Sequence, residues 1–308
     1  MTRRIAVLAV LGIGAAASAA APASGAVRNY WVAAVPVTWN VVPNQHDAIM
    51  GMMYPPSQTV FPTVVYRRYT KNWKRPLPNA PQGGGNQDLM PGPLLRARVG
   101  DRLRIHFKNM DTALHHAHSM HFHGVHYKPS SDGAFLPGFS GPDAEVKPGR
   151  SYTYRLTAGK DSVGTWPYHD HGPSMDESIA GGMWGMLSIR KRHEPLPDRE
   201  FVVVFAPMLD FQTIDGRAFV GNTPIFRSKV GQVVQWDVMA MGSEHHTFHV
   251  HGHRWRDPDG TPRDTQTVGP AESFRIRWRE HDPGTWLYHC HVESHMNAGM
   301  IGLYRVTR

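Results

Sequence analysis

Eight histidines of this sequence form four pairs whose members are separated by one residue. In a β-strand, residues two apart project from the same face, so each pair can direct two imidazoles at one metal ion. Imidazole binds copper and zinc, and a set of nitrogen ligands without carboxylates favours copper over magnesium, calcium or manganese. The four pairs are His121/His123, His169/His171, His249/His251 and His289/His291.

Cys290, the single cysteine of the chain, lies between His289 and His291. In a strand its thiolate faces away from both imidazoles, toward the interior of its own domain. Two histidines, a cysteine and a weak axial methionine are the ligands of blue-copper electron-transfer sites. One strand therefore carries a predicted blue copper on one side and ligands of a second copper site on the other. The candidate blue-copper ligands are His246, Cys290, His295 and, in the axial position, Met300.

The histidine pairs belong to a sequence that repeats itself. Residues 164–171 (GTWPYHDH) recur as residues 284–291 (GTWLYHCH), and residues 121–124 (HFHG) recur as residues 249–252 (HVHG). Matches in the same order indicate two homologous domains. Short alternating segments predict β-strands, and 30 glycines with 25 prolines argue against long helices. We predict an all-β protein with domains at 27–192 and 200–308 and a linker, which contains two prolines, at 193–199.

Composition excludes several other classes of protein. A mean hydropathy of −0.41 with 19% charged residues describes a globular chain, and one cysteine rules out an intrachain disulfide. The formal charge of +8 is scattered, with no basic stretch interleaved with aromatic residues, so we expect neither a nucleic-acid nor a membrane partner. Residues 1–26 are predicted to be a signal peptide, with Arg3 and Arg4 before a short apolar run. We therefore expect a secreted or periplasmic protein, with twin-arginine export as one route.

Together, these motifs resemble the four copper motifs of multicopper oxidases, and the two-domain length resembles the bacterial small laccases. The resemblance implies two tandem cupredoxin-like Greek-key β-sandwich domains and four coppers per chain. Asp170 stands where the first domain would need a cysteine, so that domain would hold no blue copper. By resemblance, the type 1 copper is bound by His246, Cys290, His295 and Met300. His121 and His249 would bind the type 2 copper, and His123, His169, His171, His251, His289 and His291 the type 3 pair.

The resemblance also implies an activity. A small-molecule reductant, such as a phenol, would lose single electrons at the type 1 copper, and O₂ would be reduced to water at the trinuclear cluster. Oxygen reduction needs protons, so carboxylates near the cluster matter. Asp132, Asp264 and Glu293 resemble proton-relay acids, and Tyr127 resembles a tyrosine that supplies a reserve electron. Four histidines from each domain place the cluster at a domain interface, and the small-laccase resemblance favours a homotrimer with clusters between neighbouring chains.

Three alternatives remain open. A cuprous-ion oxidase serving copper tolerance would use the same copper sites, with Met50, Met52 and Met53 as a soft site for its substrate. A copper nitrite reductase also has two cupredoxin domains, but it keeps its blue copper in the first domain, where this chain has Asp170. A copper carrier or electron shuttle would need only the Cys290 site and would leave eight histidines without a role.

Overall fold

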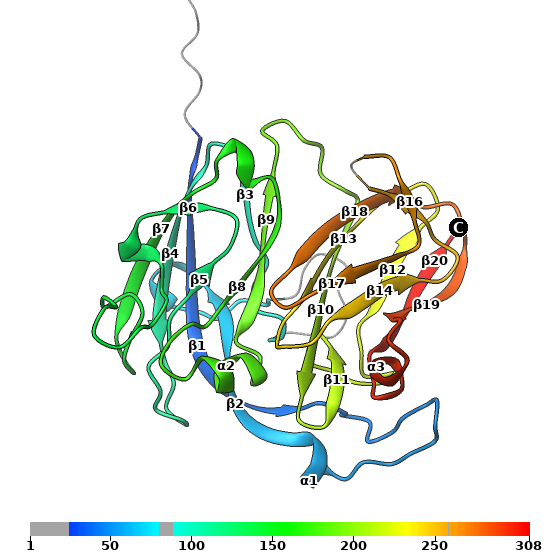
Figure 1. Cartoon of the computed structure of the whole chain (residues 1–308), viewed down its shortest axis with the longest axis horizontal. Helices are drawn as coiled ribbons and strands as arrows, with labels where there is room; N and C mark the ends of the chain where they lie inside the picture. The colour runs from blue at the N-terminus through cyan, green and yellow to red at the C-terminus, as the bar shows by residue number, and fades with distance from the viewer. Residues whose placement is uncertain (1–24, 80–88, 258) are drawn as a thin grey trace, which may run out of the picture.

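The computed structural model describes residues 25–79, 89–257 and 259–308, which form two β-sandwiches placed side by side (Figure 1). The prediction of an all-β protein is confirmed, since the few helices are short. Apart from Gly25 and Ala26, the predicted signal peptide lies outside the described residues. Among the residues described, no helix is both long and apolar enough to cross a membrane.

The first sandwich packs a five-stranded sheet of order β2-β1-β4-β7-β6 against a four-stranded sheet of order β3-β9-β8-β5. Alternating apolar residues of both sheets, such as Tyr66, Phe107 and Tyr168, fill the space between them. The strands are β1 (Val27–Asn40), β2 (Val60–Tyr69), β3 (Leu95–Arg98), β4 (Arg102–Asn109), β5 (His121–Phe122), β6 (His126–Tyr127), β7 (Ser151–Thr157), β8 (Gly164–His169) and β9 (Trp184–Arg190). The helices are α1 (Pro56–Thr59) and α2 (Met175–Ala180), with single 3₁₀ turns at Lys71–Trp73, Pro129–Ser131 and Lys160–Ser162.

The second sandwich packs a sheet of order β11-β10-β13-β18 against one of order β12-β20-β19-β14-β17. Its core is rich in aromatic rings, among them Phe201, Trp236 and Tyr304. The strands are β10 (Arg199–Met208), β11 (Phe211–Ile214), β12 (Ile225–Lys229), β13 (Val233–Ala240), β14 (His246–Val250), β17 (Thr265–Val268), β18 (Ser273–Arg279), β19 (Gly284–Cys290) and β20 (Ile301–Thr307). A separate hairpin joins β15 (Trp255–Arg256) to β16 (Pro262–Arg263), and α3 (Glu293–Asn297) follows β19.

The repeated motifs occupy equivalent places in the two sandwiches. Strand β8 lies between β9 and β5, and β19 lies between β20 and β14. On β19, Tyr288 is paired with Gly302 of β20, and a Cβ atom at Gly302 would lie only 2.5 Å from the tyrosine ring. Tyr168 and Gly185 form the same pair in the first domain, where the added Cβ would lie 2.2 Å from the tyrosine oxygen. Each tyrosine ring thus covers a glycine on the neighbouring strand. Any larger residue at that position would clash with the ring.

The two sandwiches pack against each other through an apolar cluster and a buried polar network. A third apolar cluster joins residues of β1, β2 and β9, such as Trp184, to residues of β10, β11 and β13, such as Val204. Beside it lies a buried polar network in which Arg275 of the second domain donates to the carbonyls of Gly164 at 2.9 Å and Ile189 at 3.1 Å. The same arginine bonds Asp237 at 2.8 Å. These contacts fix the two domains of one chain relative to each other.

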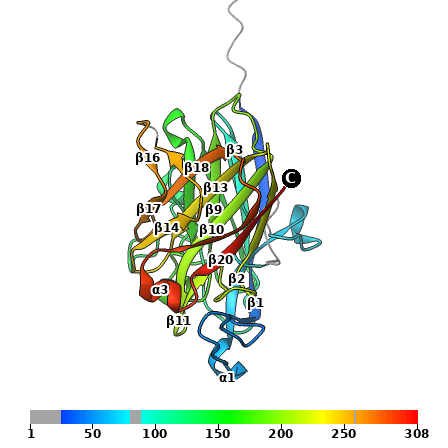
Figure 2. The same ribbon diagram turned by 90° about the vertical axis from the view of Figure 1, so that its right-hand side faces the viewer.

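A long connection between β1 and β2 extends the first domain beneath the second. It contains α1 and projects beyond both sandwiches in the two views of Figures 1 and 2. Tyr54 of this connection stacks on Phe219 of the second domain with ring centroids 5.3 Å apart. The indole N–H of Trp39 donates to the carbonyl of Gly216 at 2.6 Å. The connection and the adjoining end of β1 therefore add a second contact between the domains.

Candidate metal centres

The structure brings three of the predicted blue-copper ligands into one buried site. Cys290 ends β19, His246 begins β14, and His295 lies in α3. The Cys290 Sγ atom lies 3.8 Å from Nδ1 of each histidine, and the two Nδ1 atoms are 3.1 Å apart. His246 and Cys290 are fully buried. Three soft or borderline donor atoms at these separations can bind a single copper ion.

Met300 follows the helix that carries His295 and is itself buried. The N–H of Cys290 donates to the carbonyl of Met300 at 3.1 Å, and the N–H of Met300 donates to the carbonyl of His295 at 3.0 Å. Two backbone hydrogen bonds thus hold the residues at the predicted axial and equatorial positions together. Burial raises the pKa of the Cys290 thiol, so binding of a metal has to displace its proton.

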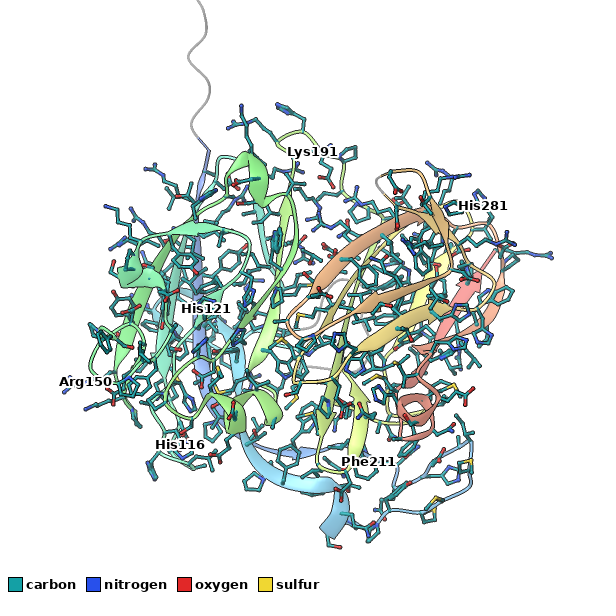
Figure 3. All side chains as sticks on the ribbon, in the orientation of Figure 1. His116, His121, Arg150, Lys191, Phe211 and His281 are labelled. Carbon is teal, nitrogen blue, oxygen red and sulfur yellow. The ribbon has the colours of Figure 1, made fainter. Side chains whose placement is uncertain are left out.

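The four first-domain histidines gather at the end of β5 and β8. The His121 ring centroid lies 5.1 to 5.5 Å from those of His123, His169 and His171. Nε2 of His123 and Nε2 of His169 are 3.2 Å apart. His121 lies in the first sandwich, well away from β14 and β19 of the second (Figures 1 and 3). The four side chains form one compact group that could bind metal.

The four second-domain histidines form an equivalent group on β14 and β19. The His249 ring centroid lies 5.1 to 5.5 Å from those of His251, His289 and His291. Nε2 of His251 and Nε2 of His289 are 3.1 Å apart. His251 and His291 are solvent-exposed in the single chain. Cys290 points from the same strand into the interior, as the alternation of side chains along a strand predicted.

Backbone carbonyls orient several of these imidazoles. Nδ1 of His121 bonds the carbonyl of Asp132 at 2.7 Å, and Nδ1 of His169 bonds the carbonyl of Asp170 at 2.9 Å. In the second domain, the carbonyls of Asp264 and Cys290 serve His249 at 2.7 Å and His289 at 2.8 Å. A carbonyl can only accept, so each Nδ1 carries the proton and each Nε2 keeps its lone pair for a metal.

Burial, followed by the neighbouring imidazoles, keeps several of these rings neutral. It lowers the pKa of His123, His169, His246 and His289 from 6.5 to about 4. A neutral imidazole is the form that binds metal. Uncharged rings that lie close together, with lone pairs facing one another, could bind copper ions.

The two groups of four do not meet within one chain. Among the described residues, no hydrogen bond or ring contact joins a histidine of the first-domain group to one of the second-domain group. The contacts between the sandwiches fix their separation. Each domain therefore carries its own separate group of four histidines.

The predicted proton-relay residues and Tyr127 differ in how they contact the cluster histidines. Oδ1 of Asp132 lies 3.3 Å from Nδ1 of His121, and Asp264 reaches His249 through its backbone carbonyl. The Tyr127 ring centroid lies 6.1 Å from that of His121, and burial together with the Asp132 carboxylate raises the pKa of Tyr127 to about 12. Glu293 begins α3 and is exposed, and within the described ranges it makes no bond to a cluster histidine.

Sequence reasoning missed a carboxylate beside the blue-copper group. Oε2 of Glu244 lies 3.3 Å from Nε2 of His295 and accepts a hydrogen bond from Gln212 at 2.7 Å. Nε2 is the side of the ring that faces away from Cys290. In the sequence, the one indication that Glu244 lies near this site is its position two residues before His246. A carboxylate thus lies beside the outer nitrogen of His295.

Sequence and structure comparisons identify related proteins. Residues 72–194 and 194–308 each match a sequence profile described as multicopper oxidase. The chain is 31% identical over 251 residues to a probable nitrite reductase-hydroxylamine oxidoreductase fusion protein of Kuenenia stuttgartiensis, covering 72% of this chain and 28% of that protein. It is 28% identical over 350 residues to the ferroxidase HEPHL1 of Homo sapiens, covering 91% of this chain and 29% of the relative.

The chain thus spans less than a third of the length of either relative. A solved structure titled as a multicopper oxidase has the same fold, with a TM-score of 0.68 at 24% identity, over 91% of this chain and 89% of that one. The two profile matches together cover strands β3 to β20 and all twelve predicted copper ligands. This chain is therefore a member of the multicopper oxidase family, with two cupredoxin domains.

Proposed function

We propose that this protein is a laccase-type oxidase that takes single electrons from phenols or other electron-rich molecules and reduces O₂ to water. The observation that carries the proposal is the architecture of β19, where Cys290 lies between two cluster histidines and its carbonyl bonds Nδ1 of His289 at 2.8 Å. Copper bound at the Cys290 site would accept single electrons from the reductant. Copper bound by the histidine groups would supply the four-electron reduction of O₂. The strand itself provides a short covalent route from the thiolate to the histidines.

The partly exposed His295 is the point of electron entry. Its side chain is 15% exposed, whereas His246 is fully buried. A reductant that contacts the His295 ring would lie close to Cys290, because Nδ1 of His295 is 3.8 Å from Sγ of Cys290. His246, which is fully buried, lies 3.8 Å from the thiol and completes the group of three.

The complete cluster is built between two chains. His251 and His291 of the second-domain group are exposed in the single chain, and the two groups of one chain stay apart. Joining a first domain to the second domain of a neighbouring copy is a head-to-tail contact, and such contacts close into rings. The resemblance to the small laccases favours a ring of three chains, with one cluster at each of its three contacts.

Copper content tests the assignment of the ligands. Purified, fully loaded protein is expected to contain about four coppers per chain, with an intense blue thiolate band and a near-ultraviolet shoulder from the coupled pair. Oxygen uptake with 2,6-dimethoxyphenol should consume about four phenols per O₂ without release of hydrogen peroxide. Two or fewer tightly bound coppers per chain would refute the trinuclear assignment.

Oxidation of a metal ion is the second candidate function, and Glu244 is the observation that favours it. The Glu244 carboxylate lies 3.3 Å from the outer nitrogen of His295, where it would attract Fe²⁺ or Cu⁺. One of the relatives is named a ferroxidase. Poor turnover of phenols with rapid turnover of a cuprous or ferrous salt would establish this function instead.

The substitution Glu244→Gln separates the two reductant classes. Removing a half-exposed charge is expected to raise the KM for Fe²⁺ by about two- to five-fold and to leave the KM for a neutral phenol unchanged. The matched control is Glu177→Gln, which alters another exposed carboxylate near a histidine, 3.7 Å from His116. Equal effects on the charged and the neutral reductant would show that Glu244 does not act through its charge.

A further inference from the structure

The first domain contains a counterpart of the blue-copper group in which Asp170 takes the place of Cys290. The N–H of Asp170 donates to the carbonyl of Met183 at 3.0 Å, as the N–H of Cys290 donates to that of Met300 at 3.1 Å. Both methionines are fully buried, and so are Asp170 and Cys290. The backbone that holds the cysteine and the axial methionine in the second domain is therefore preserved in the first.

The two histidine positions can be matched in the same way. The N–H of Met183 donates to the carbonyl of Ser178 at 2.9 Å, just as the N–H of Met300 donates to that of His295 at 3.0 Å, so Ser178 stands at the position of His295. His118 precedes its cluster motif by three residues, as does the second-domain histidine. The matched sets are His118, Asp170, Ser178 and Met183 in the first domain and His246, Cys290, His295 and Met300 in the second.

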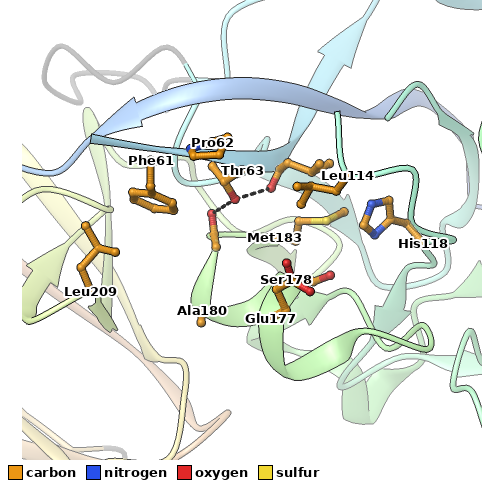
Figure 4. A pocket seen from close by; sticks show the side chains of 12 residues that line it. Phe61, Pro62, Thr63, Leu114, His118, Glu177, Ser178, Ala180, Met183 and Leu209 are labelled. Carbon is orange, nitrogen blue, oxygen red and sulfur yellow. Dashed lines mark hydrogen bonds between the residues drawn. The ribbon is translucent and has the colours of Figure 1, made fainter. Parts of the chain in front are cut away.

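A surface hollow lies where the missing imidazole would be. It has a volume of about 220 Å³ and is lined by His118, Ser178 and Met183 together with apolar residues such as Phe61 and Leu114. Figure 4 shows the ring of His118 and the side chain of Met183 beside Ser178 in this hollow. The small side chain of Ser178 thus leaves room that His295 occupies in the second domain.

A buried hydrogen-bonded pair stands at the position of the metal. Nδ1 of His118 lies 2.8 Å from Oδ2 of Asp170, and His118 is 1% exposed. Its Nε2 faces a second buried carboxylate, that of Asp111, at 3.4 Å. In the second domain the matching Nδ1 points instead at the thiol. The carboxylate therefore connects the same two segments that a copper ion would connect.

Asp170 also reaches the segments that carry the cluster histidines. Its Oδ1 accepts from the N–H of Ser119 at 2.7 Å and from that of Gly172 at 3.1 Å. Ser119 Oγ accepts from the N–H of His171 at 3.1 Å. The backbone carbonyl of Asp170 accepts from His169. One carboxylate thus ties the segment leading into β5 to the segment that follows β8.

We propose that the His118–Asp170 pair replaces copper in the first domain, positions the first-domain cluster histidines, and leaves a latent copper site beneath them. Asp170 is a positioning residue, because it acts on the imidazoles through the backbone and Ser119. The site lacks a thiolate and one imidazole, which explains why it would stay free of copper while keeping the rest of the framework.

The first test removes the pair. Asp170→Ala leaves His118 and two backbone N–H groups without their acceptor, and is expected to lower the Tm of the metal-free protein by roughly 5–10 °C. It should also weaken copper binding by the cluster about 10- to 100-fold while the blue band persists. Asp161→Ala is the matched control, because Asp161 forms an exposed pair with His126 at 2.7 Å. An unchanged Tm together with full copper content would overturn the proposal.

The second test rebuilds the missing ligands. In a Cys290→Ser background, which removes the native thiolate, Asp170→Cys with Ser178→His should create a new blue thiolate band on loading with copper. The band would arise from the first domain alone, so its appearance does not depend on the cluster or on oxidase activity. A folded variant that binds no blue copper would show that the hollow and the preserved backbone are not a latent copper site.

Discussion

Replacing Cys290 by serine is expected to abolish both the blue colour and the oxidation of any reductant, down to the rate given by free copper in buffer. The thiol sulfur lies 3.8 Å from Nδ1 of both His246 and His295, and serine is a poor ligand for this copper. The hydrogen bond from the N–H of residue 290 to Met300 remains, so the fold should survive. Visible absorption and oxygen uptake measure the effect.

The same variant distinguishes the two kinds of copper site. The eight cluster histidines are untouched, so the electron paramagnetic resonance signal of the type 2 copper should persist at full strength. His245→Ala is the matched control, since it changes an exposed histidine next to the site and should leave the colour unchanged. Oxidation retained by the Cys290→Ser protein would mean that electrons enter elsewhere.

Mixing two inactive variants is expected to restore activity if clusters form between chains. One variant carries His169→Ala and His171→Ala, which destroys the first-domain half-site but keeps the blue copper. The other carries Cys290→Ser, which keeps both half-sites but has no entry point for electrons. In a randomly mixed ring, about a quarter of the contacts pair an intact first domain with an intact second domain, so about a quarter of the wild-type rate should return.

The mixture has to be formed by unfolding and refolding the two proteins together, or by coexpression with two different tags. Copper content and recovery through both tags establish that mixed rings exist. Each variant assembled alone is the control and stays inactive. Mixed, copper-loaded assemblies without turnover would show that each chain builds its own cluster.

Much of the metal chemistry was predictable because it depends on local geometry. The alternation of side chains along a strand places His289 and His291 on one side and Cys290 on the other whatever the rest of the fold does. The repeat then assigned the same role to the first-domain pairs. In the structure, His121 lies near His171, His249 lies near His291, and Cys290 lies near His246.

The remaining features depend on loops and on packing between domains. Glu244 reaches His295 because Gln212, from a strand far away in sequence, holds it there. Ser178 was not predicted to match His295, because the first domain has three more residues between its aspartate and this position than the second has between Cys290 and His295. The role of His118 could have been predicted from the repeat. The spacing between His121 and His249 is the same as the spacing between His118 and His246.

The tyrosine that lies across a glycine on the neighbouring strand also fixes the register of β19. A slip of one residue against β20 would turn every side chain of β19 to the opposite face. Cys290 would then point to the cluster, and His289 and His291 would point into the core. Tyr288 can occupy its place only opposite Gly302, because a Cβ there would lie 2.5 Å from the ring. Tyr288 binds no metal, but its pairing with Gly302 prevents a one-residue slip of β19 that would disrupt both predicted copper sites.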